Sequence, residues 1–357
     1  METEFQMKEK EHGAMRAALS LIGSVMLPQD TSNCSERHET PSAPEFLRNL
    51  QPFQTVLLSI AFFSTVVVLI LSFIHWFYVY KYVSIEKRRN KLYWLIAVFP
   101  VACTCSYIAM CVPRTAVILT CIGVLYYLMC LFVIVSLARH LFGGRESFST
   151  CLQYDDRPID FRSPPFCCLI PRLPTARSTE KNIRRLEWCV LQAPIVRSII
   201  IFLDVVAVAE MREQATPFIR YSDMASLCSL LLAIFGVHTL ARVTSNKLSA
   251  YCFMSMFRLV DISLLFFSAQ QPMIFQNVLL RFNLISCGPL LNAQENAYFV
   301  CNFIITCEML LLSVLATWLL APRHNAMFDA YRSSMALSET SASLNETEQS
   351  IIDNETF

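Results

Sequence analysis

The sequence predicts an all-α membrane protein with seven transmembrane helices. Of its 357 residues, 55% are hydrophobic and 16% are charged, whereas a soluble domain has about 25% charged residues. Seven stretches are apolar over roughly the 20 residues that a helix needs to cross a bilayer. Lys and Arg number 29 and Asp and Glu number 28. This balance argues against nucleic acid as a partner, because such binding requires an excess of positive charge.

The predicted spans form one domain from residue 54 to residue 322. The first, third and seventh are continuous apolar runs, the second contains Pro100, and the fifth is short. The fourth and sixth contain charged residues, which a bundle interior tolerates. The predicted spans are residues 55–80, 93–112, 116–138, 188–209, 224–240, 249–269 and 298–320.

The distribution of Lys and Arg predicts the orientation, because cytoplasmic loops carry an excess of these residues. The first, third and fifth loops and the C-terminal tail together contain 18 Lys and Arg residues, whereas the other three loops contain 4. The loop 139–187 is therefore expected in the cytoplasm. An odd number of spans then places the N-terminus outside and the C-terminus in the cytoplasm.

The two tails have different predicted environments. Residues 1–53 are expected to form an extracellular tail, in which Asn33 begins an Asn-Cys-Ser glycosylation sequon. The apolar run 17–27 in this tail is too short to span the bilayer. It belongs either to an exposed tail, which we favour, or to a signal peptide. Residues 323–357 are rich in Ser, Thr, Glu and Asn and are expected to form a disordered cytoplasmic tail.

Ionisable residues within the spans are candidates for a polar pathway or substrate site, because charge in a membrane interior is costly. The alternative is that they form structural ion pairs and hydrogen bonds between helices. The sequence leaves both interpretations open. The candidates are Arg197, Asp204, His238, Arg258, Asp261 and Glu308.

The spacing of these candidates suggests their partners. Arg258 and Asp261 stand at i and i+3 on one helical face and are expected to pair locally. Arg197 has no acid at i±3 or i±4 in its span. It is therefore expected to bind a ligand or an acid on another helix, such as Glu308. His238 is expected to be a hydrogen-bonded core histidine rather than a proton carrier.

The loop 139–187 contains a cysteine pair, Cys167-Cys168, flanked by prolines, apolar residues and arginines. A zinc site would require CxxC spacing and further ligands, and a disulfide is disfavoured in a reducing compartment. S-acylation fits this composition, because cysteines near the membrane beside basic residues are typical acceptors. Two unmodified cysteines remain the alternative.

The sequence does not favour an enzyme. GxSxG and HExxH motifs are absent, and only 6 histidines are present, dispersed along the chain. Glycine is scarce, at 7 residues, and no phosphate-binding glycine motif occurs. We therefore expect no catalytic residue, metal or cofactor.

Several short motifs occur in an order that resembles the organic solute transporter alpha family. The basic stretch 87–91 precedes a second span with a central Pro100, and Leu-Phe-Gly-Gly ends the third span at 141–144. The Pro-Pro-Phe-Cys-Cys element at 164–168 follows, and the fourth span then opens with Cys-Val-Leu-Gln at 189–192. The resemblance covers roughly residues 50–325. In the sixth span, the family's aromatic-Trp-Gln element is replaced by Phe-Phe-Ser-Ala-Gln.

This resemblance implies facilitated transport of amphipathic organic anions, such as steroid conjugates or bile-acid-like solutes. It also implies a small single-span beta subunit as a partner, contact with membrane lipids, lipidation at Cys167 and Cys168, and a location in the plasma membrane. A seven-span receptor is an alternative. However, Leu-Ala-Arg-His at 137–140 replaces the expected acid-Arg-Tyr, and no proline lies in the seventh span. A lipid-organising scaffold that does not transport is a further alternative.

Overall fold

A computed structural model describes residues 40–154, 159–161, 175–211, 215–245, 247–282, 284–285, 290–319, 321 and 325–329. Asn33, Cys167 and Cys168 lie outside these residues, and so do most of both predicted tails. The statements below concern the described part of the chain.

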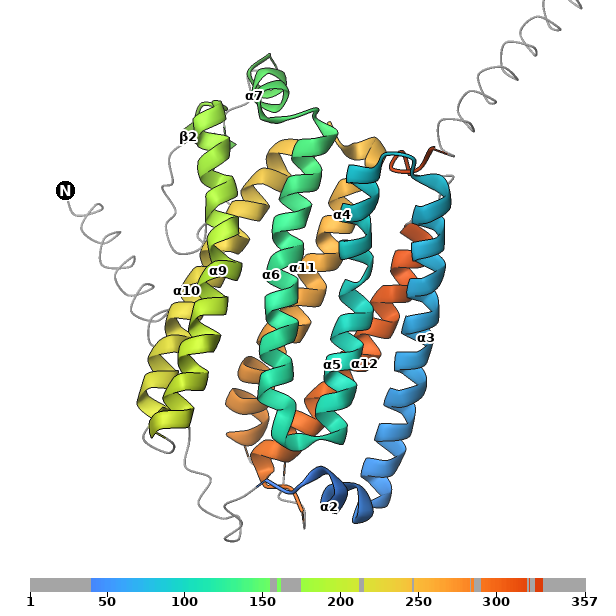
Figure 1. Cartoon of the computed structure of the whole chain (residues 1–357), viewed down its shortest axis with the longest axis vertical. Coiled ribbons are helices and arrows are strands. Elements are labelled where there is room, and N and C mark those ends of the chain that lie inside the picture. The colour runs from blue at the N-terminus through green and yellow to red at the C-terminus, as the bar shows by residue number, and fades with distance from the viewer. Residues whose placement is uncertain are drawn as a thin grey trace, which may run out of the picture.

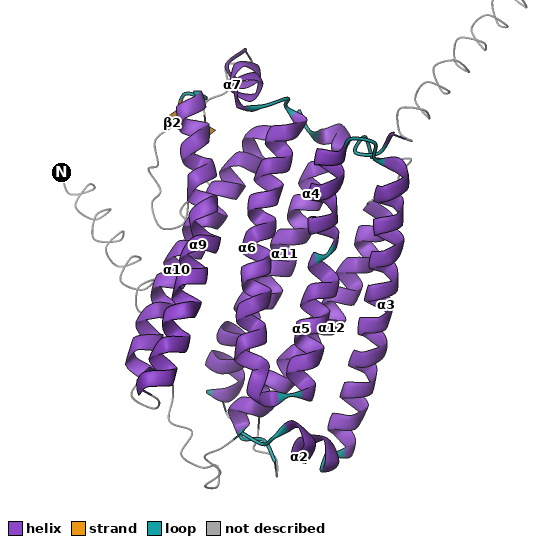
Figure 2. Cartoon of the chain, in the orientation of Figure 1, coloured by secondary structure: helices purple, strands orange, loops and turns teal. Residues whose placement is uncertain are grey.

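Seven long helical segments form an upright bundle (Figures 1 and 2). Each is long and apolar enough to cross a membrane, so the prediction of an all-α protein with seven spans is confirmed. The segments are Pro52–Tyr82, Glu86–Cys111, Pro113–Leu141, Glu180–Met211, Pro217–Thr244, Phe253–Leu280 and Ala293–Leu319.

The elements follow the chain in a simple order. α3 (Pro52–Tyr82) is the first span, and it begins with a proline and a capping box between Gln51 and Gln54. α6, α9, α10 and α12 are continuous spans, and short elements lie at the two ends of the bundle. Apart from α3, the described elements and their bounds are α2 (Ala43–Arg48), α4 (Glu86–Ile96), α5 (Val98–Cys111), η1 (Pro113–Thr115), α6 (Ala116–Leu141), α7 (Arg145–Tyr154), β1 (Ile159–Asp160), β2 (Thr175–Ala176), α9 (Glu180–Met211), α10 (Thr216–Thr244), η3 (Ser249–Tyr251), α11 (Phe253–Gln270), η4 (Gln271–Leu280) and α12 (Ala293–Leu319).

The second span is broken at Ala97, between α4 and α5. Pro100 explains this position, because a proline ring clashes with the carbonyl group four residues earlier. That carbonyl belongs to Ile96, the last residue of α4. The break therefore lies one turn before the proline itself.

The sixth span changes helical geometry in its second half. α11 ends at Gln270, and the chain continues directly into η4, a π-helix of 10 residues that ends at Leu280. π-helical turns are rare and are often found at functional sites. This segment extends the span well beyond the predicted end at residue 269.

Two parts of the bundle differ in their packing. α9 and α10 pack mainly against each other and form a hairpin at one side (Figure 1). α12 packs against α3, α5, α11 and η4, and α6 packs against both α5 and the hairpin. Among the seven spans, α9 is the least buried and the α4–α5 span is the most buried.

Large side chains fill the centre of the bundle, whereas apolar side chains on the outside face lipid. Tyr127 is fully buried, and its ring lies 5.4 Å from that of Phe267 on α11. Phe63 on α3 and Phe202 on α9 are more than 60% exposed, as expected for lipid-facing positions in a membrane protein.

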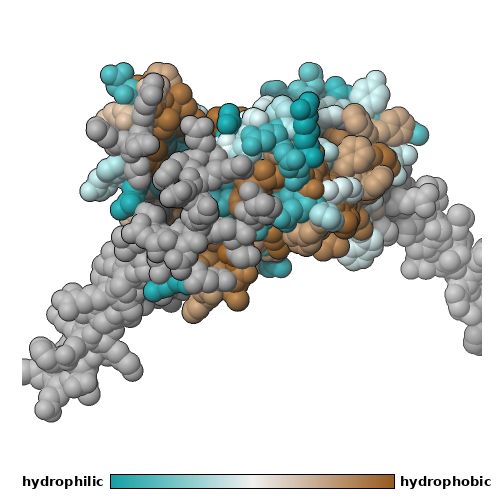
Figure 3. Space-filling model, turned by 90° about the horizontal axis from the view of Figure 1, so that it is seen from below, coloured by the Kyte–Doolittle hydropathy of each residue, from teal (hydrophilic) through white to brown (hydrophobic). Residues whose placement is uncertain are grey.

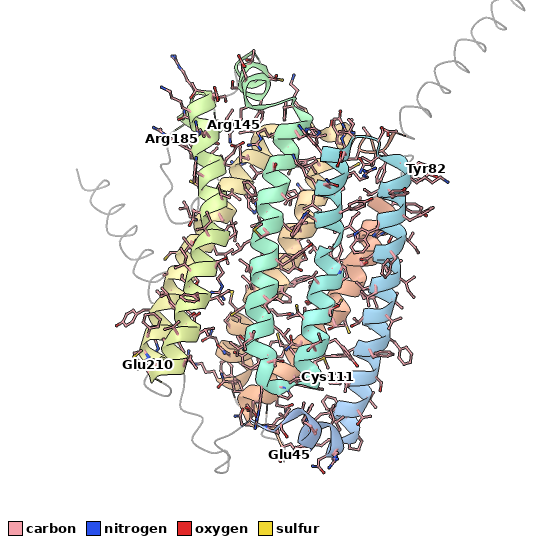
Figure 4. The ribbon with its side chains drawn as sticks, viewed as in Figure 1. Glu45, Tyr82, Cys111, Arg145, Arg185 and Glu210 are labelled. Carbon is pink, nitrogen blue, oxygen red and sulfur yellow. The ribbon has the colours of Figure 1, made fainter. Side chains whose placement is uncertain are left out.

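Charged residues gather at the two ends of the molecule. Arg145 and Arg185 lie at the upper end in Figure 4, and Glu45 and Glu210 lie at the lower end. Viewed from below, hydrophilic residues gather between apolar flanks (Figure 3). The bundle thus has the polar–apolar–polar profile of a membrane-spanning protein.

Candidate functional site

Arg197 on α9 contacts α6 and interacts with one acid on α10. Its Nη2 atom donates a hydrogen bond to the Cys121 Sγ atom on α6 at 3.5 Å. The guanidinium interacts electrostatically with Asp223 on α10, and Asp204 interacts with Asp223 in turn. The expected pair between Arg197 and Glu308 is not formed, because Glu308 is hydrogen-bonded to Gln270 instead.

Asp204 is held in place by a serine from the neighbouring helix. The Ser222 hydroxyl on α10 donates to Asp204 Oδ1 at 2.6 Å. The predicted fifth span began at residue 224 and therefore excluded Ser222 and Asp223. A helical extension of the span by two turns would have placed both residues beside α9. We call Cys121, Arg197, Asp204, Ser222 and Asp223 the Arg197 cluster.

A reciprocal amide–hydroxyl contact joins α9 and α10 further along the hairpin. Gln192 Nε2 donates to the Ser229 carbonyl oxygen at 3.0 Å, and the Ser229 hydroxyl donates to Gln192 Oε1 at 2.8 Å. Such interhelical hydrogen bonds stabilise membrane helix pairs by about 0.6 kcal/mol on average. Nothing in the sequence singles out Gln192 or Ser229 as a contact between helices, because neither is charged.

Asp261 pairs with His238 rather than with Arg258. The His238 Nε2 atom lies 3.2 Å from Asp261 Oδ1, and the pair joins α10 to α11. The His238 ring also packs edge-on against Phe257. Arg258 is exposed and forms no hydrogen bond or ion pair with a described residue. The local Arg258–Asp261 pair predicted from spacing is therefore wrong, because Asp261 turns toward α10.

Glu308 contacts the sixth span. Gln270 Nε2 donates to Glu308 Oε1 at 3.0 Å, which joins α12 to the end of α11. Both residues are half-buried in the protein. The sequence predicts a role for Glu308 but not for Gln270, because a glutamine is uncharged and does not stand out within an apolar span.

A cavity of about 670 Å³ lies at the lower end of the bundle, between η1, α6 and the start of α12. Its lining combines apolar residues such as Val117 and Phe299 with Arg114 and Tyr298. Tyr298 also interacts electrostatically with Asp223. Tyr298 therefore relates the cavity lining to Asp223 of the Arg197 cluster, although no residue of that cluster lines the cavity itself.

The opposite end of the bundle contains a buried ion pair with a structural role. Glu187 on α9 is 5% exposed. Its Oε2 atom lies 2.6 Å from Arg145 Nη2 on α7 and 3.3 Å from Arg139 Nη1 on α6. One acid therefore ties the hairpin to α6 and α7. Among the described residues, no group of His, Cys, Asp and Glu could hold a metal ion.

Seven apolar helices that enclose paired charges and amides, with a cavity at one end, define a polytopic membrane protein with a polar interior. The family model described as organic solute transporter Ostalpha matches residues 57–325. The chain therefore belongs to the organic solute transporter alpha family, a family of membrane transporters rather than enzymes.

Related proteins agree with this assignment. The chain is 94% identical to organic solute transporter alpha-like protein 3 of Caenorhabditis elegans, over 96% of this chain and 99% of the relative. It is 34% identical to alpha-like protein 1 of the same organism, over 82% of this chain and 75% of the relative. It is 22% identical to organic solute transporter subunit alpha of Bos taurus, over 77% and 81%. No solved structure matches the chain.

Proposed function

We propose that the chain carries amphipathic organic anions, such as steroid conjugates or bile-acid-like solutes, by facilitated transport across the plasma membrane. The observation that carries the proposal is the Arg197 cluster, in which a half-buried cation lies among apolar helices and its acidic neighbour Asp223 interacts with the cavity-lining Tyr298. An anionic head group would replace Asp223 as the partner of Arg197. The apolar body of the solute would contact the surrounding aliphatic and aromatic side chains.

The remaining ionisable candidates support this site in different ways. The His238–Asp261 and Gln270–Glu308 contacts join α10 to α11 and α11 to α12. We propose that these two contacts line or shape the pathway. Arg258 is exposed on α11, and we propose that it reaches the pathway from the side of the bundle.

The decisive experiment is uptake of a labelled steroid sulfate or bile acid into cells that express the full chain. Uptake is measured with and without a single-span beta subunit, which we propose as the partner. We expect uptake above that of untransfected cells in at least one condition. Its absence in both, with the chain present at the cell surface, would rule out this function.

Arg197→Ala tests the site. We expect uptake to fall at least about tenfold, because a hydrogen bond to a charged group contributes about 1.5–3 kcal/mol. Surface expression measured by biotinylation should stay close to that of the wild-type chain. Arg281→Ala removes an exposed arginine outside the cluster and serves as the control. Equal uptake by the two variants would contradict the role of Arg197.

We propose an extracellular N-terminus and a cytoplasmic C-terminus, supported by the excess of Lys and Arg in alternate loops. The cavity end would then face outside, and the Glu187 end would face the cytoplasm. Glycosylation at Asn33 tests this topology, because an Asn33→Gln variant should lose a glycosidase-sensitive gel shift. Antibody access to a C-terminal tag on intact cells would contradict it.

We propose S-acylation of Cys167 and Cys168 in a cytoplasmic loop 139–187, with residues 323–357 as a cytoplasmic tail. The supporting observation is the sequence itself, in which the pair is flanked by prolines and arginines. Acyl-exchange labelling should be lost in the Cys167→Ser, Cys168→Ser double variant. An unchanged signal would refute acylation there.

A further inference from the structure

Glu308 lies near the middle of α12, where a carboxylate would be close to the centre of the bilayer. A charged side chain at that depth costs at least about 2.5–3.5 kcal/mol. Such a residue therefore needs a compensating cation or a proton. The surroundings of Glu308 decide between these two possibilities.

No cation compensates Glu308 within the described part of the chain. Its Oε1 atom accepts from Gln270 Nε2, and its buried Oε2 atom has no hydrogen-bond partner among the described residues. On its own helix, the ionisable groups that act on it are the thiols of Cys301 and Cys307. A single neutral amide is thus the hydrogen-bond partner that a charged Glu308 would have.

The helices packed against α12 supply no positive charge to Glu308 either. Cys103 on α5 interacts with the Cys307 thiol, and His75 on α3 is hydrogen-bonded to Thr317. On α11, Asp261 is paired with His238, and the exposed Arg258 lies more than three helical turns from Gln270. On α6, the Tyr127 hydroxyl contacts the Met309 sulfur. The η4 segment contains no ionisable residue.

The hydrogen bond between Gln270 and Glu308 lies where the sixth span changes from α-helix to π-helix. Gln270 ends α11, and Gln271 begins η4, followed by Pro272. The Gln270 Oε1 atom is buried and has no partner among the described residues. The Gln271 amide interacts with the Tyr298 hydroxyl. The junction therefore places an unpaired oxygen atom of Gln270 next to a mid-membrane acid whose own Oε2 atom is unpaired among the described residues. Such concentrations of unpaired polar atoms in a protein interior call for a specific explanation.

We propose that Glu308 is an intramembrane proton-binding site, which holds its proton on Oε2 at neutral pH and accepts from Gln270 at the α-to-π junction. A bound proton removes the charge from the bilayer centre and leaves a carboxylic acid that can donate a hydrogen bond. A metal cation would require several oxygen ligands, whereas Gln271 presents an N–H group. Loss of the proton would place a charge at the junction and disturb the packing of the sixth span against α12.

Infrared difference spectroscopy on the purified full chain in lipid nanodiscs tests this site. We expect Glu308→Gln to remove a carbonyl stretching band of a protonated carboxylic acid from the spectrum at neutral pH. Glu295→Gln is the matched control on the same helix, because Glu295 Oε2 accepts from the Asn292 backbone at the helix end. That variant should retain the band. Loss of carboxylate bands alone in Glu308→Gln would overturn the proposal.

Two further measurements keep the result decisive. The band should be the same in sodium and in sodium-free buffer, and its disappearance in sodium would show a metal-cation site instead. If Glu308→Gln fails to fold, the wild-type chain is treated with dicyclohexylcarbodiimide, which modifies protonated carboxyl groups in the membrane. Mass spectrometry should find the adduct on Glu308 and not on Glu295. A wild-type chain with neither the band nor the adduct contradicts a protonated Glu308.

Discussion

The α9–α10 hairpin and the helices around α12 handle polar residues in different ways. In the hairpin, polar side chains of one helix bind those of the other, as in the contacts of Gln192 with Ser229 and of Asp204 with Ser222. Around α12, close apolar packing dominates, and Gln270–Glu308 and His75–Thr317 are isolated contacts. Because the hairpin satisfies many of its own polar groups, it makes few polar contacts with the rest of the bundle and packs mainly against α6.

This difference indicates that the α9–α10 hairpin is the part that can move and that the helices around α12 form the rigid part. The hairpin reaches the other helices through Glu187 at one end, the Arg197 cluster toward the other, and the His238–Asp261 pair. A carrier needs one part that can shift against another. The hairpin is the part whose polar contacts with the other helices are few enough to be broken one at a time, while its packing against α6 remains.

Glu187→Ala is the change with the largest expected effect, because it detaches the hairpin from α6 and α7. Removing one partner of a buried ion pair costs about 3–5 kcal/mol, and we expect the lower value because both arginines are about one-third exposed. Thermal unfolding in detergent should show a markedly lower midpoint. Glu180→Ala removes an exposed acid from the start of the same helix and should change the midpoint little.

Gly123→Ala tests how tightly the helices opposite the hairpin are packed. An added Cβ atom would lie 2.2 Å from Phe267 Cζ, so the buried ring must move, at a cost of about 1–3 kcal/mol. Gly236→Ala is the matched change in the hairpin, where the nearest atom is Val190 Cγ2 at 3.1 Å. There, the next atom is the Leu186 carbonyl oxygen at 3.2 Å, so the neighbours must give by only a few tenths of an ångström and the loss of stability should be smaller. Both changes gain about 1 kcal/mol in helix propensity. Equal losses of stability would remove the distinction between the two regions.

Gln192→Ala and Ser229→Ala, alone and together, measure how strongly the two hairpin helices are coupled. We expect a coupling energy of about 0.6 kcal/mol and at most about 1.7 kcal/mol, as found for interhelical hydrogen bonds in membranes. The measurement is a double-mutant cycle on thermal or denaturant unfolding. Strictly additive effects would show that the hairpin does not depend on this contact.

Cys252→Gly has the smallest expected effect and tests the connection from the hairpin to α11. Cys252 has a φ of 49°, the left-handed region that favours glycine. Glycine should raise stability by up to about 1 kcal/mol, whereas Cys252→Ala keeps the strained backbone and should give no gain. Burial also raises the pKa of the Cys252 thiol, so a maleimide should react slowly with it at neutral pH. A larger loss for glycine than for alanine would contradict the strain.

The sequence predicts the membrane-spanning helices better than the side-chain contacts between them. Seven spans were expected from apolar length alone, and Pro100 marked a break that lies at Ala97, one turn earlier. The π-helical half of the sixth span was missed, because its glutamine, asparagine and proline residues lower the hydropathy of residues 271–280. Asp223 was missed because α10 begins at Thr216, about two turns before the apolar run that defined the predicted span.

The sequence by itself determined the number of membrane-spanning helices and the candidate charges within them, because hydrophobic length is a local property of the chain. Tertiary structure alone decided the partners: Asp261 with His238, Glu308 with Gln270, and Arg197 with Asp223 of α10. Those partners depend on how each helix is rotated and which helix packs beside it. Both are settled by packing over the whole bundle, to which spacing along one helix contributes only a small part.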